Sequence, residues 1–165
     1  MFEPHWTTFA ELIRTPFQHV ALIWGIVPLY FGLLLNELTA SKASYRTAVQ
    51  TGFSFLWAAA QWLYPYFKTD GPHPAPGSMP LVNLLVTVVV VVFGTAALYS
   101  GLRQRYPKHG AFLGHTRFSN YFMITIYPMQ AHALGWTWER LGAIALFALP
   151  IWLVLHFGLL PVRNR

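Results

Sequence analysis

Five apolar stretches, each close to the length of a transmembrane helix, constrain the fold of this chain more than any other feature. A helix that crosses about 30 Å of hydrocarbon needs roughly 20 apolar residues at about 1.5 Å of rise per residue. The stretches cover approximately residues 17–35, 45–64, 79–101, 119–136 and 141–160. We therefore expect an all-α, polytopic helical membrane protein, whose five or so transmembrane helices form a single domain over residues 1–165.

Three of these stretches contain features that compete with a straight spanning helix. The valine-rich run 86–92 is typical of a strand, but the stretch around it is far longer than the roughly 4 to 8 residues of a buried strand, so we assign a helix. Pro28 is expected to kink the first span. The fourth stretch is short and holds Pro128, Gln130 and His132, so a re-entrant or broken helix is an alternative there.

The residues ahead of the first stretch show the pattern of a short helix that lies in the membrane interface. Apolar residues recur there at helical spacing, opposite a polar face. They are Trp6, Phe9, Leu12 and Ile13. A frayed terminus is the alternative interpretation. Thr15 and Pro16 suit the cap and the first turn of the spanning helix that follows.

Charge and cysteine content exclude several classes of protein. Only 10% of the residues are charged, whereas roughly a quarter are charged in soluble domains. The eleven Lys and Arg residues are scattered between apolar runs, so the net charge of +6 does not indicate a nucleic-acid partner. The absence of cysteine excludes disulfides, thiolate nucleophiles, iron–sulfur clusters and covalently attached haem.

The distribution of basic residues predicts an orientation. With five spans, the N-terminus and the second and fourth loops share one side, which carries three basic residues, namely Arg14, Lys68 and Arg140, and the other side carries eight. Because short loops rich in Lys and Arg stay cytoplasmic, we expect a protein of the cell (inner) membrane with its N-terminus outside and its C-terminus in the cytoplasm. Trp62 and Trp136 then fall near the outer interface, where amphipathic rings prefer to lie.

Polar and small residues inside the stretches are expected to make contacts between helices. A polar group in hydrocarbon needs a partner, and most such groups act as interhelical hydrogen-bonding residues. The polar set is Gln18, His19, Gln50, Gln61, Asn83, Gln130, His132 and His156. Small residues allow the close approach of two helices. The small set is Gly25, Gly32, Gly94, Ala97 and Gly101.

His19, Gln130 and His132 are the candidate cofactor-binding residues. His19 and His132 are expected at similar depth near the outer boundary. Two neutral imidazoles that face each other across helices can hold haem iron or a metal, whereas His132 with Gln130 can hydrogen-bond a quinone carbonyl. Neither histidine shows the spacing of a metal motif, so we assign no metal site. Histidines that hydrogen-bond without a cofactor are the alternative.

The loop after the third stretch is the candidate site for a lipid headgroup or another anion. It carries Arg103, Arg105, Lys108 and Arg117. Four cations in a short segment can bind phosphate or dock an acidic partner. The alternative is a purely topological role, as the positive anchor of the cytoplasmic side.

Three functions are compatible with these observations. The first is a non-catalytic subunit or assembly partner of a larger membrane complex, whose partners are the lipid bilayer and other membrane subunits. The second is a small transport or binding protein that houses haem, quinone or lipid near His19 and His132. The third is an enzyme acting on a lipid-soluble substrate, which we place last because the chain has five acidic residues, no thiol and no recognisable catalytic motif.

Overall fold

The part of the chain described by the computed structural model, residues 3–39, 45–67, 79–103 and 117–158, is helical and contains no strand. The helices are α1 (Glu3–Gln18), α2 (Val20–Thr39), α3 (Tyr45–Phe67), α4 (Pro80–Arg103), α6 (Arg117–Gln130) and α7 (Trp138–Gly158). The prediction of an all-α fold is confirmed.

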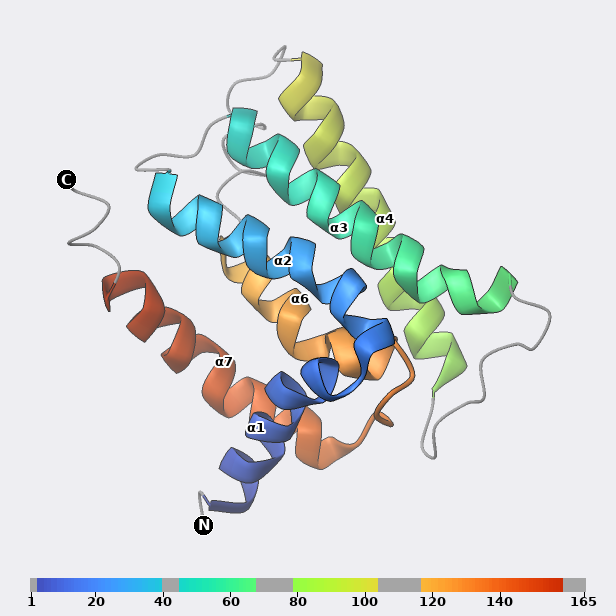
Figure 1. Ribbon diagram of the computed structural model, residues 1–165, viewed down its shortest axis with the longest axis vertical. Coiled ribbons are helices and arrows are strands. Elements are labelled where there is room, and N and C mark those ends of the chain that lie inside the picture. Colours follow the sequence, from blue (N-terminus) through green and yellow to red (C-terminus); the bar gives the residue numbers. More distant parts are fainter. Residues whose placement is uncertain (1–2, 40–44, 68–78, 104–116, 159–165) are drawn as a thin grey trace.

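The helices form a bundle in which α2, α3, α4, α6 and α7 run in alternating directions (Figure 1). Helix α1 departs from this pattern, because it meets α2 at an angle of 110°. It packs against α7 and α6 and also contacts α2. The ends of the alternating helices therefore lie at two opposite ends of the bundle (Figure 1). The α3–α4 pair forms one side of the bundle, and α7 with α1 forms the other (Figure 1).

Within the described residues, two helices, α4 and α7, are long and apolar enough to cross a membrane. The bent pair of α1 and α2 adds a third if the pair counts as one span. Helix α3 has 23 residues but interrupts its apolar sequence with polar side chains, and α6 has only 14 residues, which is about 21 Å of helix. Among the described residues, the structure is a helical bundle with two or three helices that are long and apolar enough to span a membrane, and the number of five spans stays a prediction.

Two helix boundaries differ from those expected. The predicted first span, residues 17–35, is divided at His19, because α1 continues through Thr15 and Pro16 to Gln18 and α2 begins at Val20. The predicted fourth span, residues 119–136, is interrupted, because α6 ends at Gln130 and the chain turns before α7. This second difference corresponds to the broken-helix alternative.

Small residues bring α3 and α4 into close contact, at Gly101 as expected and also at Gly52, which the sequence did not single out. A Cβ atom built on Gly52 of α3 would lie 2.6 Å from the backbone nitrogen of Leu98 in α4. A Cβ atom on Gly101 of α4 would lie 2.9 Å from the carbonyl oxygen of Tyr45. Only glycine fits at either position without movement of the backbone. Close backbone approach through small residues is the usual way in which helices associate in lipid.

A hydrogen bond from α3 supplies the donor that a backbone carbonyl of α2 lacks because of Pro28. Pro28 has no N–H, so the carbonyl of Trp24, four residues earlier, has no donor within the helix. The indole Nε1 of Trp57 in α3 donates to that carbonyl at 2.9 Å. Such replacement donors are what make proline tolerable in a membrane helix.

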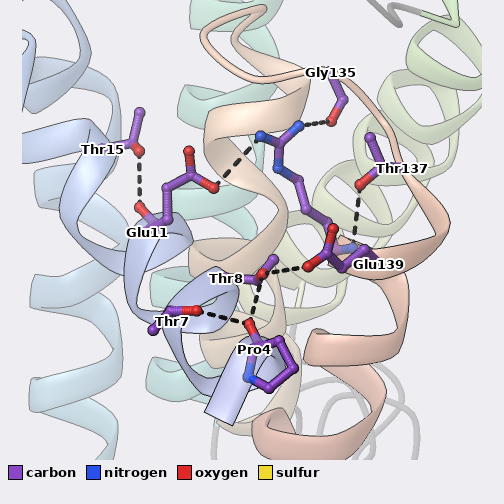
Figure 2. Close-up of polar contacts among 9 residues, drawn as sticks. Pro4, Thr7, Thr8, Glu11, Thr15, Gly135, Thr137 and Glu139 are labelled. Carbon is purple, nitrogen blue, oxygen red and sulfur yellow. Dashed lines mark hydrogen bonds and ion pairs between the residues drawn. The ribbon is translucent and has the colours of Figure 1, made fainter.

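Polar contacts attach α1 to the start of α7 (Figure 2). A guanidinium nitrogen of Arg140 lies 3.4 Å from a carboxylate oxygen of Glu11, and another donates to the carbonyl of Gly135 at 2.7 Å. The hydroxyl of Thr8 donates to the carboxylate of Glu139 at 3.1 Å. These contacts hold α1 across the chain reversal that separates α6 from α7.

The apolar face of α1 is partly covered by protein, and Trp6 on that face is 51% exposed. Phe9 and Leu12 belong to the buried core. The rings of Trp6 and Phe9 lie 5.5 and 5.7 Å from the ring of Phe147 in α7. The expected N-terminal helix is therefore present, and its apolar stripe packs on α7, while its location in a membrane interface stays a prediction.

Candidate functional site

A cavity of about 450 Å³, whose walls are mostly apolar, lies between the end of α3, the start of α4 and the end of α6. Its lining residues are Trp62 and Leu63 from α3, Pro80, Leu81, Asn83, Leu84 and Thr87 from α4, and Gln130 and His132 from α6 and the turn after it. This volume falls in the usual range of small-molecule pockets, about 300 to 1,000 Å³.

The backbone after α6 is turned sharply at His132, which has a φ of 59°. The amides of Ala133 and Leu134 both donate to the carbonyl of Pro128, at 3.0 and 3.1 Å, and so cap the end of the helix. Glycine usually occupies the left-handed position of such a cap. A histidine there is uncommon and costs backbone energy of about 1–2 kcal/mol, which points to a role for its side chain.

Hydrogen bonds to Asn83 fix the orientation of the His132 ring. The indole of Trp136 can only donate, and it donates to Oδ1 of Asn83. The other amide atom, Nδ2, is therefore the donor, and it lies 3.2 Å from Nδ1 of His132. In a neutral His132, Nδ1 must then accept, so the proton resides on Nε2.

The protonation state of His132 is consistent with this arrangement. His132 lies in the turn between α6 and α7, outside the helices long enough to span a membrane. Burial lowers its pKa below the ordinary value of 6.5. The imidazole is therefore neutral at pH 7, and its Nε2–H is a hydrogen-bond donor.

Two buried polar side chains in the cavity wall have no hydrogen-bond partner among the described residues. Gln130 is 1% exposed, and both Nε2 and Oε1 of its amide are unpaired. Trp62 is also 1% exposed, and its Nε1–H is unpaired. A buried unpaired group costs about 1–3 kcal/mol, so such groups call for an explanation. Both residues line the cavity, but these polar atoms have no accessible surface of their own, so a ligand in the cavity would reach them only after their side chains rotate.

The cavity carries no formal charge when His132 is neutral. Amide, indole and imidazole groups provide both donors and acceptors, so the walls suit a neutral molecule with oxygen atoms. Two exposed leucines of α4, Leu81 and Leu84, stand on the wall with side chains 80% and 56% exposed. Because α4 is apolar enough to span a membrane, such an exposed apolar border would face lipid.

The predicted cofactor-binding residues are only partly brought together. Gln130 and His132 line the same cavity, whereas His19 is exposed at the break between α1 and α2 and does not line it. The arrangement thus offers one of the two imidazoles that a bis-histidine haem requires. Among the described residues, no group of three or more His, Asp or Glu side chains could hold a metal ion.

Two members of the site were not assigned to it from the sequence. Asn83 is expected to bond between helices, but its bonds go to His132 and Trp136 in the turn between α6 and α7, and its pairing with His132 has no sequence signal. The sequence predicts that Trp62 is an interfacial aromatic residue. Its position one turn from the end of α3 is the only signal that would have suggested a common level with Asn83 at the start of α4.

The predicted anion-binding loop falls mostly outside the described residues. Arg105 and Lys108 lie there, and Arg117 is the first residue of α6. Arg103 is exposed at the end of α4, with its guanidinium carbon 5.7 Å from the ring centre of Tyr99. The ends of α4 and α6 that carry Arg103 and Arg117 lie at the same end of the bundle (Figure 1).

Comparison of the chain with protein-family models, with curated proteins and with solved structures gives no match.

Proposed function

We propose that this protein is a membrane-embedded binding protein for a neutral, lipid-soluble molecule that carries carbonyl oxygens, with quinones as the chemical class. The observation that carries the proposal is the buried, unpaired amide of Gln130 in a cavity that it shares with His132 and Trp62. This role corresponds to the binding-protein hypothesis, with Gln130 and His132 retained and His19 left out of the site.

The lining residues supply the bonds that a quinone ring needs. Nε2 of Gln130 and Nε1 of Trp62 are unpaired donors, and rotation of either side chain would turn them toward a carbonyl oxygen in the cavity. His132, whose ring is oriented by Asn83, lies in the same cavity wall. If the quinone is reduced, its hydroxyl groups can donate to Oε1 of Gln130. The leucines at the border provide an apolar path for a hydrocarbon tail.

Binding of 2-decyl-1,4-benzoquinone to the purified protein in neutral detergent, measured by equilibrium dialysis, tests this function. The Q130M and W62F variants should each bind about three- to tenfold more weakly, because one hydrogen bond contributes about 0.5–1.5 kcal/mol. The matched controls are Q18M and W138F, at an exposed glutamine and at an indole with 85% exposure, and neither should change the affinity. Equal binding of decylbenzene, which lacks the oxygens, would refute the proposal.

A second function, as a non-catalytic subunit of a larger membrane complex, is favoured by a different surface. An apolar groove of about 760 Å³ lies between α4, α6 and α7, lined by residues such as Val89, Phe122 and Leu141. A partner helix would fill this groove through close packing of its side chains. Larger membrane chains should then co-purify in mild detergent. A protein that migrates alone in every detergent tested would contradict this role.

A further inference from the structure

A second cavity, of about 360 Å³, lies between α1, α2, α6 and α7 and shares no residue with the cavity described above. Seven of its ten lining residues are apolar. The other three are Arg14 of α1, Tyr30 of α2 and Tyr121 of α6. The cavity therefore combines one cation and two phenols with an otherwise apolar wall, which is the composition expected around an amphiphile with an anionic head.

Arg14 forms no ion pair with a described residue. The two carboxylates that could compete for it are engaged elsewhere, because Glu11 pairs with Arg140 and Glu139 accepts from Thr8. The Arg14 side chain is exposed, so its guanidinium is open to a ligand. A cation that borders an apolar cavity favours an anionic partner.

Tyr121 is a second, independent indication of a ligand. Its side chain is 4% exposed, and its buried hydroxyl has no hydrogen-bond partner among the described residues. Tyr30 is half-buried on the opposite wall, where its ring lies 5.6 Å from that of Phe17. Both phenols can donate to an anionic oxygen while Arg14 neutralises its charge.

One wall of the cavity lies well along helix α7. Ile151 lines the cavity and lies thirteen residues after the start of α7 at Trp138, about 20 Å along that helix. Because α7 is long and apolar enough to cross a membrane, this level is well inside the apolar part of the molecule.

We propose that this cavity binds a single-chain amphiphile with an anionic headgroup, a carboxylate or a phosphate. Arg14 forms the ion pair, the hydroxyls of Tyr30 and Tyr121 donate hydrogen bonds, and apolar side chains such as Phe9, Leu33 and Ile124 hold the start of the chain. The volume is at the lower end for ligand pockets, so it suits a headgroup with part of one chain.

Native mass spectrometry in neutral detergent tests the site, with dodecanoate, dodecyl phosphate, dodecanol and inorganic phosphate as separate probes. The two anionic amphiphiles should bind, and dodecanol and inorganic phosphate should each bind at least tenfold more weakly. R14Q should weaken the binding of dodecanoate at least tenfold, and R14K should recover most of it. Y121F should weaken it about threefold. R46Q, at an exposed arginine of α3, is the matched control and should bind as the unmodified protein does.

Two outcomes would overturn the proposal. The first is equal binding of dodecanoate to R14Q and to the unmodified protein. The second is binding of inorganic phosphate as tight as that of dodecyl phosphate, which would indicate a site for free anions. Decylbenzoquinone should not displace dodecanoate, because the two cavities are separate. The quinone proposal and this one can therefore fail independently.

Discussion

Replacing Gln130 with methionine should stabilise the ligand-free protein and at the same time weaken its binding of a quinone. Methionine has a similar length and shape but no polar atoms, so it fills the same space without burying an amide. Both amide atoms of Gln130 are buried and unpaired among the described residues, and a group of this kind costs about 1–3 kcal/mol. The free energy of unfolding of Q130M should therefore rise by about 1–3 kcal/mol.

The assay is unfolding of the ligand-free protein by increasing mole fractions of sodium dodecyl sulfate in mixed micelles, followed by tryptophan fluorescence. Q18M serves as the control, because Gln18 is exposed and its replacement should change the free energy by less than about 0.5 kcal/mol. If the amide instead stabilises the fold, the free energy of unfolding of Q130M should fall. A loss of 1 kcal/mol or more in Q130M, with none in Q18M, would refute the reasoning, since the amide would then have a partner in the folded protein.

Three further changes test the packing and the charge state. G52L should lower the free energy of unfolding by about 1–3 kcal/mol or abolish folding, because its Cβ would lie 2.6 Å from a backbone nitrogen of α4; circular dichroism during thermal unfolding measures this. W57F should cost about 1 kcal/mol in the same assay through loss of the bond to the Trp24 carbonyl, and an unchanged midpoint would contradict that bond. The pKa of His132 is lowered in the folded state, so the folded protein binds fewer protons at His132 than the unfolded protein does. The contribution of His132 to the free energy of unfolding is therefore complete above about pH 6.5 and is lost as the pH falls further. An H132N variant should show a flatter pH dependence of unfolding, and an equally steep one would exclude His132 as the cause.

The helices were largely predictable, because backbone groups in lipid must bond within their own segment. The apolar runs therefore marked α4 and α7 directly. The boundaries at His19 and Gln130 were not predictable, since they depend on tertiary contacts. Pro16 lies inside α1, and the turn after Gln130 is held by a capping carbonyl at Pro128. Proline at either place is equally compatible with a helix that begins or continues there.

Some residues of the candidate site were predictable from the sequence and others were not, and the difference has a physical cause. Gln130 and His132 are two residues apart, so any sharp turn or helix end keeps them on neighbouring surfaces. Their grouping therefore did not depend on the packing of distant segments. His19 was joined to them by depth alone, and depth does not determine which way a side chain points around the bundle. Asn83 and Trp62 belong to the site because α3 and α4 pack closely through Gly52, which is a contact between segments far apart in the sequence.

Helix α1 shows what an amphipathic pattern does and does not determine. The spacing of Phe9 and Leu12 predicts that one face meets an apolar environment, and both of these side chains are buried. The pattern is the same whether the environment is lipid or another helix, so it cannot choose between them. The choice is made by polar contacts outside the stripe, above all the pairing of Glu11 with Arg140. Because α1 is held there, Arg14 borders the second cavity, whereas no residue of α1 lines the first. An R140M variant should therefore loosen α1 and weaken the binding of dodecanoate while leaving that of decylbenzoquinone unchanged, and equal weakening of both ligands would show that α1 also supports the first cavity.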